Sequence, residues 1–173
     1  MRTIVFTTLL LCLFLACCEK RQPPSARNPP GAPDTQFVES FFQDYAAAFR
    51  SKSKARLLAK FSLPLTFLTK TGPIVFQDEE HLSANLEALL RRYEQIQAVD
   101  FKHRIKEVRP IGAGILLADL EWRFFDPRDE LLYACDTTYL LATEAKPSAK
   151  VMAVIAHNEV ERYEEALKRK KGG

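Results

Sequence analysis

The sequence predicts one α+β domain, and three patterns along the chain support that prediction. Residues 34–50 and 78–95 repeat apolar side chains at helical spacing. Two short apolar runs joined by a glycine-containing turn, within 65–77, are typical of a β-hairpin. The longest pattern is a block from 98 to 158, which alternates like extended strands and is interrupted only by short turns. A chain of 173 residues with 47% hydrophobic content can bury one ordinary core.

Three helices are expected before the long block of strands. In the first, residues 34–50, an aromatic stripe is formed by Phe37, Phe41, Tyr45, Ala48 and Phe49. A short second helix is expected over 53–61, with Ser53 as its N-cap. The third, 78–95, begins with three acidic residues, which favour the positive end of a helix.

Six strands are expected, two of them in the hairpin at 65–70 and 73–77. The other four span 98–109, 113–125, 131–143 and 149–158. Their turn signals are at 110–114, 126–129 and 146–148. Strands joined by links this short pair antiparallel with their sequence neighbours, so the block is expected to form a four-strand meander.

The formal charge of +3 is concentrated at the start of the chain. Residues 1–33 hold four basic residues against one acidic residue, whereas 34–173 hold equal numbers of each. A nucleic-acid-binding domain normally carries a basic face of its own. Because the predicted domain is neutral, we expect no nucleic-acid partner.

Residues 1–17 have the pattern of an export signal. A single arginine precedes a short apolar run, which is too short to span a membrane and ends at Ala16-Cys17. A small residue before a cysteine resembles the bacterial lipobox, in which that cysteine receives the lipid. Cys17 is therefore the expected lipidation site of a membrane-anchored lipoprotein on the periplasmic or cell-surface side. The alternative is an ordinary signal of a secreted protein.

The segments that flank the predicted domain are polar. Residues 18–33 hold five prolines among polar residues and are expected to be a disordered tether. Residues 159–173 form a charged tail that is expected to be partly helical. Outside the signal and the tether only Cys135 remains, so no disulfide framework is expected.

Several motifs, taken together, resemble the nuclear-transport-factor-2-like (SnoaL-like) superfamily over residues 34–158. They are the aromatic first helix (41–45) and the segments Leu63–Thr66, Ala118–Trp122, Thr137–Tyr139 and Ile155–Glu159. The resemblance implies a strongly curved, mostly antiparallel sheet that wraps three N-terminal helices into a cone with an internal pocket. It leaves the function open, because this fold hosts isomerases, dehydratases, adaptors and binding domains.

Strand alternation sorts the side chains by face. The apolar faces, expected to point inward, include Phe101 and His103 on one strand and Trp122 and Phe124 on the next. On the last strand, His157 shares a face with Val151, Ala153 and Ile155 and is expected inside with them. Aromatic residues that could line a ligand pocket are Tyr45, Phe101, Trp122, Phe124 and Tyr139.

The third strand of the meander, 131–143, has two mixed faces. By size, Tyr139 is expected inside. If the other face points inward, Asp136 becomes a buried carboxylate and a stronger catalytic candidate. Mixed faces also favour a covered outer surface, such as a homodimer formed through the sheet.

The candidate catalytic residues are His103 and His157, which could exchange protons near neutral pH, with Tyr139 or Asp136 assisting. No metal site is expected: Asp78 and His81 have helical ligand spacing, but an acidic first turn explains them more simply. No cofactor motif is present.

The sequence therefore favours a membrane-tethered domain that binds a small apolar or aromatic ligand, or a partner, without assured catalysis. The alternatives are a lyase or isomerase that uses pocket histidines, and a dimeric interaction module.

Overall fold

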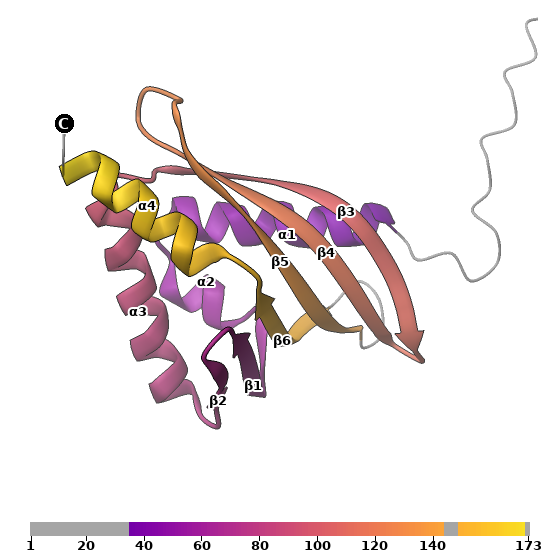
Figure 1. Cartoon of the computed structure of the whole chain (residues 1–173). Helices are drawn as coiled ribbons and strands as arrows, with labels where there is room; N and C mark the ends of the chain where they lie inside the picture. Colours follow the sequence, from indigo (N-terminus) through magenta and orange to yellow (C-terminus); the bar gives the residue numbers. More distant parts are fainter. Residues whose placement is uncertain (1–34, 144–148, 172–173) are drawn as a thin grey trace, which may run out of the picture. The chain divides into compact units, whose positions relative to one another are not determined.

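The computed structural model describes residues 35–143 and 149–171. Its four helices are α1 (Thr35–Arg50), α2 (Lys54–Leu58), α3 (Glu79–Gln95) and α4 (Glu159–Lys171). Its six strands are β1 (Phe61–Thr69), β2 (Gly72–Phe76), β3 (Asp100–Gly112), β4 (Ile115–Phe125), β5 (Leu131–Thr143) and β6 (Ala149–Ala156). The α+β class and the order of the elements are confirmed (Figure 1). The predicted signal, lipidation site and tether, and the turn at 146–148, lie outside the described residues.

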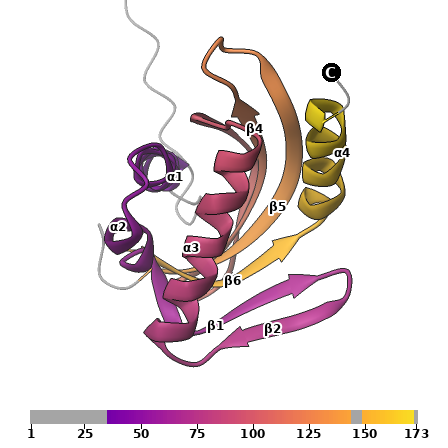
Figure 2. The same ribbon diagram turned by 90° about the vertical axis from the view of Figure 1, so that its left-hand side faces the viewer.

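The strands form one curved, open sheet in the order β2-β1-β6-β5-β4-β3. The hairpin and the meander pair antiparallel, as predicted. The one parallel pair, β1 with β6, joins the hairpin to the meander. Figure 2 shows α1 and α3 on the concave side of this sheet and α4 beside β5. None of the helices described is long and apolar enough to cross a membrane.

The helices form where the sequence predicted them, with one shortened. The aromatic stripe of α1 packs into the core: Phe41, Tyr45, Ala48 and Phe49 are buried, and Phe37 is partly buried. Ser53 caps α2, but that helix ends at Leu58, because Phe61 is needed as a buried residue of β1. Asp78 caps α3 by accepting a hydrogen bond from the backbone N–H of His81 at 2.9 Å.

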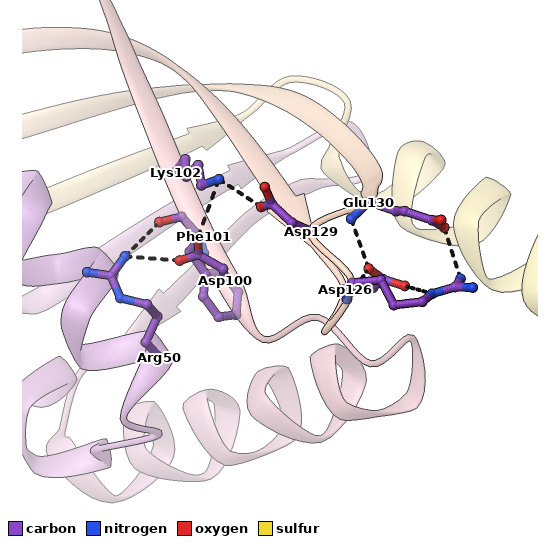
Figure 3. A network of polar contacts seen from close by, with 8 residues as sticks. Arg50, Asp100, Phe101, Lys102, Asp126, Asp129 and Glu130 are labelled. Atoms are coloured by element: carbon purple, nitrogen blue, oxygen red, sulfur yellow. Dashed lines mark hydrogen bonds and ion pairs between the residues drawn. The ribbon is translucent and has the colours of Figure 1, made fainter.

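Polar contacts fasten the end of α1 and the β4–β5 turn to the sheet (Figure 3). Arg50, the last residue of α1, donates to Asp100 Oδ1 at 3.2 Å. Lys102 bonds Asp129 in the turn at 2.9 Å. Asp126 closes that turn by accepting from the backbone N–H groups two and four residues further on. These contacts fix one end of the concave face.

On β5 the face with the larger side chains points inward. Tyr133, Cys135 and Tyr139 are all at most 4% exposed. Asp136 lies on the opposite face, where it pairs with Lys106 of β3. The alternative in which Asp136 is a buried carboxylate is therefore ruled out, because its neighbours on both sides fill the core.

A bulge in β6 overturns one prediction. Leu140 of β5 pairs with Ala153 and Leu141 with Val151, so Met152 is an extra residue. One inserted residue exchanges the two faces of everything that follows it. Val151 and Val154 are therefore both buried, and His157 lies on the outer side of the sheet rather than inside.

Candidate functional site

A cavity of about 40 Å³ lies inside the domain, between the helices and the concave face of the sheet. All five residues that were predicted to line a ligand pocket lie in its wall: Tyr45, Phe101, Trp122, Phe124 and Tyr139. A single water needs about 10–15 Å³ of such space, so the cavity can hold about three water-sized groups. Ligand binding itself stays a prediction.

The polar atoms of the cavity wall form hydrogen bonds with one another. Trp122 Nε1–H donates to the Tyr139 hydroxyl at 2.9 Å, and both residues are buried. Burial raises the pKa of both the Tyr139 and the Tyr45 hydroxyl. These tyrosines are therefore neutral hydrogen-bonding groups, held in fixed positions inside an aromatic core.

Among the residues that the structure describes, Glu159 is the one charged residue in the cavity wall. It is the first residue of α4, and its Oε1 accepts a hydrogen bond from the Tyr93 hydroxyl of α3 at 2.7 Å. Burial raises the pKa of the Glu159 carboxyl, and the Tyr93 hydrogen bond and the nearby Arg92 charge oppose that shift only in part. The site thus holds a carboxyl group whose proton is unusually well retained.

Sequence reasoning did not select Glu159 as a site residue. It was assigned to the charged tail and to the closing motif Ile155–Glu159. The available signal was its position: it is the first acidic residue after the last apolar strand, where the chain leaves the sheet beside the concave face. An acidic residue at a helix start has a ready explanation in the helix dipole, which concealed this second role.

His103 is buried beside the cavity but does not line it. Its ring lies against those of Phe42 and Trp122, with centroids 6.0 and 5.4 Å away. Nε2 is 3.0 Å from Glu39 Oε1, yet the contact lacks hydrogen-bond geometry, so this nitrogen has no hydrogen-bond partner among the described residues. Burial lowers the pKa of His103, which is therefore a neutral residue of the core at pH 7.

His157 and Asp136 belong to the outer face. His157 Nε2 is 2.8 Å from the Thr138 hydroxyl, which donates to Asp119 of β4. The sheet therefore separates His157 from His103, and the two histidines cannot act on one substrate as the predicted acid–base pair. Asp136 pairs with Lys106 and does not assist either of them. The predicted homodimer through this outer face stays a prediction.

The Asp78–His81 pair is exposed, with Nδ1 2.8 Å from the carboxylate. Over residues 35–143 and 149–171, no three side chains of the metal-ligating types converge. The pair acts as a helix cap.

The buried His103 predicts a loss of stability in mild acid. Its pKa is lowered in the folded state, so the unfolded chain takes up the proton at a higher pH than the folded one. The stability that neutral His103 contributes to the folded domain is fully present above the unfolded pKa of about 6.5 and is lost as the pH falls below it. Urea unfolding between pH 7.5 and 5 should show this slope, and His103→Phe should flatten it. An equal slope in wild type and His103→Phe would contradict the assignment.

Glu159 predicts the opposite dependence of stability on pH. Its raised pKa means that the folded chain keeps a proton that the unfolded chain has released, so stability falls as the pH rises from about 4.5 through the folded pKa. Glu159→Gln keeps the acceptor for Tyr93 without the charge and should stabilise the domain at pH 8 by about 0.5–1 kcal/mol. Thermal and urea unfolding measure this, with Glu164→Gln on the exposed face of α4 as control. Destabilisation by Glu159→Gln would show that the charge itself supports the fold.

Solved structures with a similar fold are numerous, and the three that follow are distant in sequence. A domain of unknown function with a cystatin-like fold from Nostoc punctiforme PCC 73102 has a TM-score of 0.55 and 13% identity, covering 78% of this chain and 85% of that one. An NTF-2-like protein of unknown function from Shewanella oneidensis MR-1 has a TM-score of 0.55 and 10% identity, covering 70% and 97%. A ketosteroid isomerase-like protein from Erwinia carotovora atroseptica SCRI1043 has a TM-score of 0.51 and 14% identity, covering 72% and 95%.

At these identities the likeness concerns the fold alone. A search of curated proteins found no significant match. The model of one protein family, described as NTF2-like protein (DUF6841), matches residues 34–159, which include every strand and end at Glu159. The chain therefore belongs to the NTF2-like protein family DUF6841.

Proposed function

We propose that this domain binds a small ligand in the cavity between its helices and the concave face of the sheet. One observation carries the proposal: within the described residues, the wall of an aromatic cavity contains one carboxyl group, Glu159, which is hydrogen-bonded to Tyr93 and has no basic side chain beside it in that wall. A core selected only for stability would fill this space and would avoid a partly desolvated acidic group. Stability given up at one place in a fold is typical of a functional site.

The arrangement of the wall supports the same conclusion. The rings give apolar contact area, and a few polar atoms at fixed positions give orientation, which is the usual composition of a small-molecule site. Those polar atoms come from different elements: Tyr45 from α1, Tyr93 from α3, Trp122 from β4 and Glu159 from α4. Their positions are set by the fold as a whole, so the site is formed before a ligand arrives.

The second candidate is an acid–base enzyme of the lyase or isomerase type. The pair of histidines cannot supply it, but Glu159 has the properties of a proton-transfer group: a raised pKa, a hydrogen-bonded position and contact with an internal cavity. Tyr93 holds the carboxyl in place. Loss of turnover in Glu159→Gln, with the cavity ligand still bound, would distinguish catalysis from binding.

We also propose that the domain is tethered to a bacterial membrane through a lipid on Cys17. The support is the sequence of residues 1–33: an apolar run that stops at Ala16-Cys17, followed by a proline-rich polar segment. The ligand would then be bound outside the cytoplasm, at the length of the tether from the membrane.

The tether is tested by fractionation. Cys17→Ser should move most of the protein from the membrane fraction to the soluble fraction, because one substitution removes the acylated side chain. Cys18→Ser is the matched control and should stay with the membrane. Membrane association that is unchanged in Cys17→Ser would remove the lipid anchor from the proposal.

The cavity is tested by filling it. Val154 lines the cavity, and the next residue, Ile155, faces the outer groove, so the two give a matched pair. Val154→Phe should abolish ligand binding and cost about 1–3 kcal/mol through overpacking, whereas Ile155→Phe should leave binding unchanged. Emission of Trp122, the only tryptophan, reports occupancy directly when small alcohols and amines are titrated. Equal binding to wild type and Val154→Phe would place the ligand elsewhere.

A further inference from the structure

We propose that the preferred ligand of this cavity is a small organic ammonium ion, whose N–H groups meet the Glu159 carboxylate and whose alkyl part contacts the surrounding aromatic rings. This inference rests on the proposed ligand-binding function and specifies the chemical class of the ligand. It follows from the hydrogen-bonding capacity of the wall, its charge and its aromatic character.

Hydrogen bonding within the wall leaves acceptor capacity on Glu159. Trp122 Nε1–H donates to the Tyr139 hydroxyl at 2.9 Å, and the Tyr93 hydroxyl donates to Glu159 Oε1 at 2.7 Å. An ionised carboxylate offers about four acceptor sites on its two oxygens, and the Tyr93 hydrogen bond uses one of them. A carboxylate oxygen only accepts, so a ligand that bonds Glu159 directly must bring a donor.

The charge of the wall points to a cationic donor. Among the described residues, no basic side chain lines the cavity. The cation that acts on Glu159, Arg92 of α3, has an exposed side chain, so solvent screens its charge. The Glu159 carboxylate is half-buried against the aromatic wall, and a ligand that brings a positive charge offsets the cost of this partial desolvation. An anionic ligand would add a second negative charge to the same space.

The aromatic wall suits the same ligand. The rings that line the cavity include Tyr45, Phe49, Tyr93, Phe101, Trp122 and Phe124. Aromatic rings attract ammonium groups through their negative faces, and several rings with a carboxylate form the usual surroundings of a bound organic cation. The volume of about 40 Å³ limits the ligand to a compact one.

Proton exchange at Glu159 gives the proposal a distinctive pH dependence. The groups that face this carboxyl come from every element around it: Tyr93 and Arg92 of α3, Tyr45 of α1, and Tyr133, Cys135 and Tyr139 of β5. Burial raises the pKa of all four tyrosines and of the thiol, so none of them ionises near neutral pH.

Glu159 is therefore the group that releases its proton when a cation binds. Affinity for an ammonium ion should rise with pH, and affinity for a neutral carbonyl ligand should fall.

The test uses four one-carbon compounds that are small enough for the cavity: methylamine, methanol, formamide and formate. Each is titrated into the full chain at pH 5, 6.5 and 8, with Trp122 emission and calorimetry as readouts. The amine stays protonated over this range. At pH 8 it should bind about tenfold more tightly than the alcohol, and this ratio should grow from pH 5 to pH 8. Glu159→Gln should bring the ratio close to one, while Glu164→Gln should leave it unchanged.

The outcomes separate this inference from the proposed function. If the alcohol or the amide binds as well as the amine, or if the amide binds best at pH 5, the cavity binds ligands but the ammonium assignment is wrong. If formate binds best, the charge argument is wrong. If none of the four compounds changes Trp122 emission or releases heat, both this inference and the proposed ligand-binding function fail.

Discussion

The packing of aromatic rings between α1 and the concave face of the sheet is the interaction on which the rest of the structure depends. Phe42 of α1 is fully buried, and its ring contacts those of Tyr45, Trp122 and Tyr139. An open, curved sheet leaves its apolar inner face in water unless helices cover it. Because α1 provides the rings that cover this face, the helix and the strands β4 and β5 are stable only together.

Building the core from rings also explains why it contains a cavity and polar atoms. Flat rings that meet at steep angles, such as Phe42 with Trp122 at 74° and Tyr45 with Tyr139 at 76°, do not fill space as closely as branched aliphatic side chains. Tyrosine and tryptophan also bring a polar atom into the core, which must find a partner. The hydrogen bond from Trp122 to Tyr139 satisfies two of these atoms, and the hydrogen bond from Tyr93 to Glu159 satisfies a third. The same residues therefore stabilise the fold and line the site.

Much of the fold could be predicted from the sequence, because helical stripes and strand alternation are local patterns with a fixed period. The size of Tyr139 was enough to place the inner face of β5 correctly. The faces at the end of β6 could not be predicted, because the bulge at Met152 is set by how β6 pairs with β5 and not by the composition of β6. The alternation along β6 predicted that His157 points inward, and this prediction was wrong because the bulge exchanges the two faces of the strand.

Glu159 illustrates a different limit, since its role depends on two opposing effects that act at one position. As the first residue of α4 it lies at the positive end of the helix dipole, which favours the charged carboxylate. Its position against the aromatic wall of the cavity removes it in part from bulk water, which favours the neutral acid. Burial has the largest effect on the pKa of Glu159 and raises it, while the hydrogen bond from the Tyr93 hydroxyl and the charge of Arg92 favour the carboxylate and oppose that shift in part. A group held in this balance changes its protonation with a small change in its surroundings, and a bound ligand is such a change.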